Sequence, residues 1–232
     1  MLERFIIWLL VQVAKNMPQK TFIEYLARFE YASYLFYRRH SMKLSEFKRY
    51  AESFTFENLA RVEYTHYYML CSEILGIECQ SWEDVVRRDT KCEWSLHLNQ
   101  KCDNLSTKYL SLRWFFKGKS AKDFTTLETA VFTTLIEQWQ GHFYKLLYTN
   151  TITCKTIKII AKEESLNGVD MMKTLINHYS NDYEQELKKW SSRKTIMWLL
   201  VFFDLIAEYV YQNVHQTLME LDNPYFDSKD YD

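Results

Sequence analysis

The sequence predicts an all-α fold built from long helices. It contains 4 Gly and 2 Pro among 232 residues, whereas average usage of these two residues would give roughly 28. Neither residue occurs between Pro18 and Gly76, or between Gly168 and Pro224. Sheets, hairpins and glycine-rich phosphate loops need Gly and Pro at their turns. The composition therefore disfavours Rossmann domains, P-loops, β-sandwiches and β-barrels.

Apolar residues at helical spacing divide the chain into five predicted helices. Polar residues from Ser41 to about Ser53 separate the first two, and Gly76 ends the second at a position typical of glycine. Residues 77–124 form a mixed connection, and a polar turn at 149–151 separates the third and fourth helices. The predicted helices are Thr21–His40, Thr55–Leu75, Thr125–Tyr148, Cys154–Tyr179 and Thr195–Leu221.

These elements predict a single domain over residues 1–232. Its core bundle covers about 21–180, an additional C-terminal helix covers about 195–221, and residues 222–232 form an acidic tail. The long link between the second and third helices distinguishes this arrangement from a simple up-and-down bundle.

The net charge and the cysteine content indicate which binding partners and which cellular compartment to expect. The net charge of −1 argues against broad electrostatic binding to nucleic acid or to an anionic membrane surface. Five cysteines without a Cys-x-x-Cys pair are typical of free thiols in a reducing compartment. The apolar segment Phe5–Ala14 resembles a signal-peptide core but lacks a net-positive start and a small-x-small cleavage site. The apolar run 196–203 is too short to span a bilayer, so we expect a cytoplasmic protein.

Single carboxylates lie within the apolar faces of four predicted helices. Apolar residues flank Glu63 at spacings of three, four and seven, and His66 lies one turn further along the same face. Glu30, Glu137 and Glu164 occupy similar positions on the first, third and fourth helices. An unpaired buried carboxylate costs several kcal/mol. Four such groups that converge therefore require cations to neutralise them.

Iron or manganese would supply this positive charge, because oxygen-rich ligand sets suit these hard ions. Two-metal helical bundles use one Glu from each of two helices and a Glu-x-x-His motif from each of the other two. The second helix has a complete motif, whereas the fourth has Asn167 where histidine is expected. We therefore expect the ion near the fourth helix to bind more weakly. The predicted metal ligands are Glu30, Glu63, His66, Glu137 and Glu164.

The predicted ligands also satisfy the register of antiparallel hairpins, in which residues equidistant from the turn lie at the same level. The midpoint of Glu30 and Glu63 is 46.5, inside the polar linker 41–53. The midpoint of Glu137 and Glu164 is 150.5, inside the turn 149–151.

The same residues carry a family resemblance. Leu59–His66, with its Glu-x-x-His motif, resembles the second helix of ferritin-like di-iron proteins such as rubrerythrin. Two further segments, Ile136–Tyr144 and Ile159–Glu164, resemble the third and fourth helices of poorly characterised ferritin-like proteins, whose fourth helix typically reads Asp-Glu-x-x-His. The resemblance covers roughly residues 21–180. It implies a ferritin-like four-helix bundle with a dinuclear iron or manganese–iron site that reacts with dioxygen or peroxide.

Three hypotheses for function follow. The first is an oxygen-dependent di-iron or manganese–iron oxygenase or oxidase that acts on a small or lipid-like substrate. The second is a metal-binding ferritin-like protein that is non-catalytic or consumes peroxide. The third is a helical protein that binds protein or lipid and has a partial or lost metal site. An electron donor and a second copy in a homodimer are compatible partners, whereas the substrate is not encoded in the sequence.

Individual residues also have simpler interpretations. His66 alone is also typical of a hydrogen-bonded core histidine, and Glu30 or Glu137 of a salt bridge. Glu128 is a rival to Glu137 on the third helix. Aromatic residues mainly fill the core, and Tyr34 and Tyr67 are the best placed for a redox relay.

Overall fold

A computed structural model of the chain describes most of residues 2–76 and several later segments. The described residues are 2–74, 76, 83–84, 124–150, 154–164, 182–191, 199, 202–203, 205–207 and 210. All regular secondary structure within these ranges is helical, so the structure confirms the all-α class. None of the described helices is long and apolar enough to cross a membrane.

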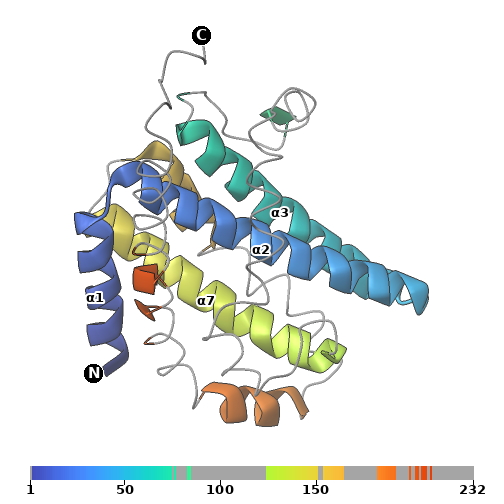
Figure 1. The fold of residues 1–232 in the computed structure, drawn as a ribbon. Helices are drawn as coiled ribbons and strands as arrows, with labels where there is room; N and C mark the ends of the chain where they lie inside the picture. The colour runs from blue at the N-terminus through green and yellow to red at the C-terminus, as the bar shows by residue number, and fades with distance from the viewer. Residues whose placement is uncertain are drawn as a thin grey trace, which may run out of the picture.

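The first helix, α1 (Leu2–Asn16), covers the segment that resembles a signal-peptide core. One side of this amphipathic helix is buried, including Ile7 and Leu10, and α1 contacts α7 at one end of the bundle (Figure 1). Pro18 occupies the N-cap of the next helix. Proline disfavours a helical conformation at the preceding residue, which explains why the chain changes direction here.

Helices α2 (Gln19–Glu46) and α3 (Tyr50–Ile74) form a long antiparallel hairpin (Figure 1). The link contains only residues 47–49, so the predicted polar linker 41–53 is largely helical. Burial explains the difference, because Leu44 is 3 % exposed and the hydroxyl groups of Ser41 and Ser53 lie 3.1 Å apart across the hairpin. Lys48 has a φ of 58°, a left-handed conformation that closes the turn.

Helix α7 (Thr126–Asn150) begins with a capping box. The backbone N–H of Glu128 donates to Thr125 Oγ1 at 3.2 Å, and the N–H of Thr125 donates to Glu128 Oε2 at 2.8 Å. Glu128 therefore caps the start of the helix, which resolves its rivalry with Glu137 in favour of Glu137 as the buried residue.

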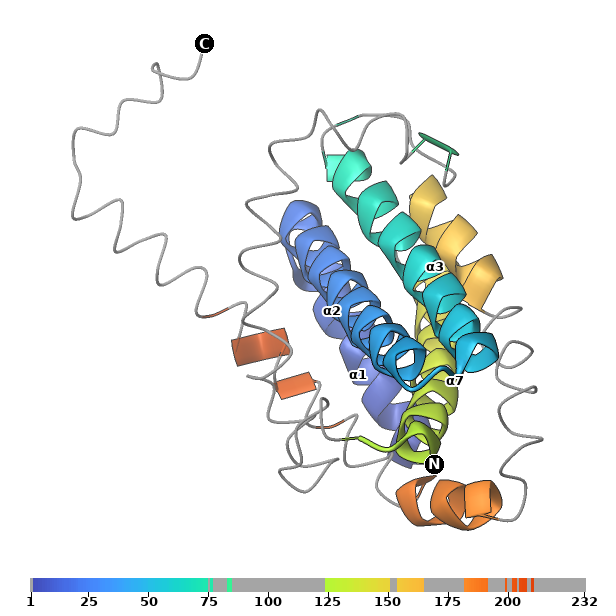
Figure 2. The same ribbon diagram turned by 90° about the vertical axis from the view of Figure 1, so that its right-hand side faces the viewer.

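A helical segment at residues 155–164 follows α7 and lies beside α3 (Figure 2). Thr156 Oγ1 donates to Glu73 Oε2 at 2.8 Å, which joins this segment to the end of α3. The rest of the predicted fourth helix, including Asn167, lies outside the described residues.

A helix at residues 182–191, which the sequence analysis did not predict, packs on α7. Tyr183 donates to Thr134 Oγ1 at 2.8 Å, and the rings of Trp190 and Phe124 are 6.3 Å apart. The described positions of the predicted C-terminal helix are helical, and Leu205 is buried. The connection 85–123 and the tail 222–232 lie outside the described residues.

A buried histidine in the α2–α7 interface gives the fold a pH dependence. His40 is 5 % exposed, and its Nδ1 lies 3.3 Å from Thr129 Oγ1. Burial, followed by the charges of Lys43 and Arg49, lowers the pKa of His40 to about 4. The unfolded chain protonates this residue near the ordinary histidine pKa of about 6.5. Stability is therefore lost as the pH falls from about 6.5 towards 4.

We predict that His40→Gln removes this part of the pH dependence. Between about pH 7 and pH 5, the free energy of unfolding of the wild type should fall by about 2 kcal/mol more than that of the variant. Urea denaturation at each pH measures the difference, and the carboxyl groups that titrate in both proteins cancel. Parallel pH profiles would contradict a neutral, buried His40.

Candidate metal centre

Four buried side chains from three helical segments converge inside the bundle. Glu30 comes from α2, Glu63 and His66 come from α3, and Glu164 comes from residues 155–164. One potential ligand atom from each lies within 4.8 Å of the others, and none of these residues is more than 5 % exposed. This arrangement could hold a metal ion.

His66 presents its two ring nitrogens to different surroundings. Nδ1 lies 3.0 Å from Glu164 Oε1 and 3.6 Å from Glu30 Oε2, whereas Nε2 lies 2.9 Å from Glu163 Oε2. A hydrogen bond from Nε2–H to Glu163 would leave the Nδ1 lone pair directed at the carboxylates. Outer carboxylates of this kind commonly orient histidine ligands and make them more basic.

Glu137 lies next to the four-residue group, on α7. Tyr37 donates to Glu137 Oε1 at 2.7 Å, and the carboxyl groups of Glu63 and Glu164 both lie close enough to influence the pKa of Glu137. Glu137 is thus a neighbour of the group and is not one of the four residues whose ligand atoms lie within 4.8 Å of one another. The structure therefore brings four of the five predicted ligands into one group and places Glu137 beside it.

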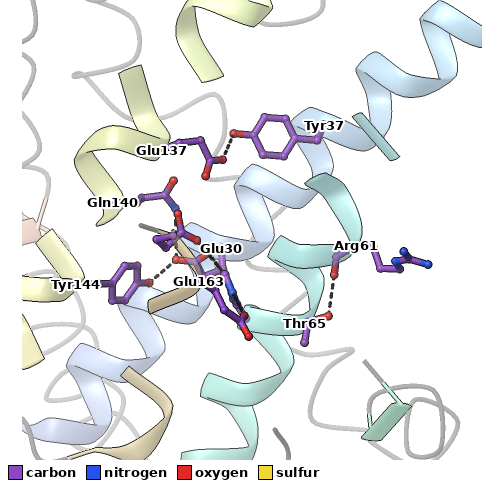
Figure 3. Close-up of polar contacts among 10 residues, drawn as sticks. Glu30, Tyr37, Arg61, Thr65, Glu137, Gln140, Tyr144 and Glu163 are labelled. Carbon is purple, nitrogen blue, oxygen red and sulfur yellow. Dashed lines mark hydrogen bonds and ion pairs between the residues drawn. The ribbon is translucent and has the colours of Figure 1, made fainter. Parts of the chain in front are cut away.

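Two tyrosines hold the single glutamates of α2 and α7 in a reciprocal arrangement (Figure 3). Tyr37 of α2 donates to Glu137 of α7, and Tyr144 of α7 donates to Glu30 of α2. Each tyrosine lies seven residues, or two helical turns, after the glutamate on its own helix. The pairing relates the two halves of the site by an approximate two-fold symmetry.

Burial dominates the electrostatics of this centre. Burial, reinforced by the charges of Glu30, Glu137 and Glu164, raises the pKa of Glu63 well above its ordinary value. Burial also raises the pKa values of Glu137 and Glu164. Each of these three carboxyl groups is therefore harder to ionise inside the bundle than it is in water.

For Glu30 and His66, interactions with neighbouring side chains outweigh the effect of burial on the pKa. Burial opposes ionisation of Glu30, but His66, Glu63 and the Tyr144 hydroxyl together lower its pKa. Burial also opposes protonation of His66, but Glu163, Glu164 and Glu30 raise its pKa well above the ordinary value. The two shifts have opposite directions because the imidazole and the carboxylate each stabilise the charged form of the other.

Unsatisfied polar atoms mark the same place. Among the described residues, four buried atoms of this cluster make no hydrogen bond of good geometry, although His66 Nδ1 lies at ion-pair distance from Glu164 Oε1 and Glu30 Oε2. These atoms are Glu30 Oε2, Glu63 Oε2, His66 Nδ1 and Glu164 Oε2. Leaving buried polar atoms unpaired costs about 1–3 kcal/mol each. A metal ion bound to these three oxygens and one nitrogen would satisfy all four atoms, so the residues fit the ion that the sequence predicts.

Sequence reasoning missed the residues that surround the ligands. Glu163 is half-buried and lies on a helix face of mixed polarity, so the neighbouring residues in the sequence did not indicate that it approaches the site. Tyr34 and Tyr67, the predicted relay residues, pack in an aromatic cluster with Tyr31 and Tyr64. Tyr37 and Tyr144, which the sequence analysis did not single out, donate hydrogen bonds to Glu137 and Glu30. Their shared seven-residue spacing from Glu30 and Glu137 is the signal that could have identified them.

Comparison with protein-family models, with curated proteins and with solved structures finds no significant match to this chain. The candidate centre therefore rests on its own geometry and chemistry.

We predict that Glu63→Leu stabilises the metal-free protein. The substitution replaces a buried carboxyl group, whose Oε2 is unpaired, by an apolar side chain of similar size. The free energy of unfolding should rise by about 1–3 kcal/mol when urea denaturation is performed in excess chelator.

Glu57→Leu is the matched control, because Glu57 is an exposed glutamate on the same helix. It should change the free energy of unfolding by less than about 0.5 kcal/mol. A Glu63→Leu protein less stable than the metal-free wild type would show that Glu63 is a satisfied structural residue.

Proposed function

We propose that the protein is a ferritin-like metal-carboxylate protein and acts as an oxygen-dependent di-iron or manganese–iron oxygenase or oxidase. The observation that carries the proposal is the group of four buried ligand atoms within 4.8 Å of one another, from Glu30, Glu63, His66 and Glu164. A buried cluster of this composition is costly as a purely structural feature. Metal binding would offset that cost.

The donor set favours iron or manganese over other ions. Three carboxylates and one imidazole form a mainly hard, oxygen-rich set that suits these metals. Calcium and magnesium normally take oxygen ligands alone, and structural zinc sites usually include cysteine sulfur. No cysteine contributes to the group described here.

The arrangement of the helices supports the ferritin-like assignment. The hairpin of α2 and α3 lies against α7 and residues 155–164 (Figure 2). Helices α2 and α3 and residues 155–164 supply carboxylates to the buried group, and α7 supplies the buried Glu137 beside it. The single glutamates come from α2 and α7, and Glu63 and His66 form the Glu-x-x-His motif of α3, as in two-metal bundles.

The protein's own residues would have distinct roles. Glu30, Glu63, His66 and Glu164 would bind one ion, while Glu137 would complete a second position with Glu63 and Glu164. Tyr144 and Tyr37 would fix the orientations of Glu30 and Glu137 through their hydrogen bonds. Bound iron would supply the capacity to reduce dioxygen or peroxide. The buried aromatic surroundings would keep bulk water away from this chemistry.

His66→Ala tests the metal-binding part of the proposal. Removing the imidazole should lower the iron content of protein purified from iron-replete cells at least severalfold, because metal affinity depends on every ligand. The wild type should hold iron nearer one ion per chain than two, because Asn167 replaces the histidine of the second motif. Elemental analysis measures both quantities.

His142→Ala provides the matched control, since His142 is an exposed histidine on α7. Its iron content should equal that of the wild type. Wild-type protein that purifies without metal from iron-replete cells, and gains no thermal stability from added iron(II) or manganese(II), would overturn the proposal. If the metal is present, consumption of dioxygen by the reduced protein distinguishes an oxygen-dependent enzyme from a non-catalytic metal protein.

A further inference from the structure

The end of the α2–α3 hairpin carries an exposed apolar patch that the proposed metal site does not use. Its members, here called the tip patch, are Met42, Phe47, Tyr50 and Phe54. They are 57 %, 68 %, 65 % and 67 % exposed. Figure 1 shows this end of the hairpin projecting beyond the neighbouring end of α7.

The tip patch is as large as the largest apolar patch of a typical monomer, which is often functional. Aromatic side chains each offer about 150–250 Å², so four large side chains that are about two-thirds exposed present roughly 500 Å². The largest apolar patch on a typical monomer is about 300–600 Å² and is often functional. A stable protein–protein interface normally covers about 800 Å² on each partner. The tip patch therefore suits insertion into a membrane surface better than a flat protein interface.

Basic residues accompany the patch. Residues 38–54 contain five Lys or Arg and two Glu, a net charge of +3, although the whole chain carries −1. Arg38, Arg39 and Lys48 are exposed, and Arg38 also donates to Tyr34 Oη and lies over the Tyr34 ring. Of the two carboxylates, Glu46 is exposed and Glu52 pairs with Arg49 at 2.7 Å.

Two basic residues of this segment form hydrogen bonds with the residues at the start of α7. Lys43 Nζ donates to the backbone oxygen of Phe124 at 3.3 Å, and Arg49 donates to Thr126 Oγ1 at 3.1 Å. Both contacts tie the hairpin end to the start of α7. These two hydrogen bonds hold the end of the hairpin, and with it the exposed aromatic side chains, in a fixed position relative to α7.

From these observations we propose that the tip patch docks the protein on an anionic membrane surface. Phe47, Tyr50 and Phe54 enter the interfacial layer, where aromatic side chains are favoured. Arg38, Arg39 and Lys48 face the negatively charged headgroups, which attract basic residues close to the surface. This proposal does not depend on the metal site.

Sedimentation with lipid vesicles tests the docking. Wild-type protein should bind vesicles of phosphatidylcholine mixed with phosphatidylserine at least about fivefold more tightly than phosphatidylcholine alone. Raising the salt concentration from about 0.1 M to 0.5 M should weaken the binding, because salt screens exposed charges. Absence of binding to either vesicle, or equal binding to both, would overturn the proposal and leave the patch to a protein partner.

Variants locate the docking surface. Phe47→Ser/Tyr50→Ser/Phe54→Ser should weaken binding to the anionic vesicles about tenfold or more, while Lys48→Glu should weaken it and reduce its salt dependence. The single Phe47→Ser variant gives the same comparison if the triple variant folds poorly. Phe5→Ser/Trp8→Ser removes a similarly exposed aromatic pair from α1 and should bind as the wild type does. Equal loss in this control would contradict docking through the tip.

Discussion

The interaction on which the rest of the structure depends is the clustering of His66 with buried carboxylates. Glu30, Glu63 and Glu164 place their oxygens around one imidazole nitrogen in a region that solvent hardly reaches. Desolvation and mutual repulsion oppose this arrangement, as the raised pKa values of Glu63 and Glu164 show. The fold must therefore hold these groups in place, and a bound cation is the simplest source of the missing stabilisation.

Several features of the bundle serve this purpose. The short link after α2 fixes the register of the hairpin, so that Glu30 meets Glu63 and His66. Tyr37 and Tyr144 then connect α2 and α7 through the single glutamates on each helix. Glu163 binds the outer nitrogen of His66 and joins α3 to residues 155–164. Packing between helices and orientation of the site thus depend on the same hydrogen bonds.

The sequence was sufficient to predict the all-α class and the α2–α3 hairpin. It also predicted the burial of Glu30, Glu63, His66, Glu137 and Glu164, because one carboxylate inside an apolar helical face is a strong local signal. Contacts between helices could not be predicted in this way. The roles of Glu163 and Tyr144 depend on which side chain faces them from another helix, which local periodicity does not specify. The polar residues 41–46 also looked like a linker, because the burial of Leu44 and the Ser41–Ser53 contact arise only when the hairpin packs.

The most direct test of the central claim is a crystal structure of protein loaded with iron(II), with diffraction data collected on both sides of the iron absorption edge. The account predicts an anomalous peak that appears above the edge between His66 Nδ1 and the carboxylates of Glu30, Glu63 and Glu164. A weaker peak is expected beside it, between Glu137 and Glu164. An empty centre in crystals grown with excess iron, with Glu30 and His66 still paired, would contradict the account.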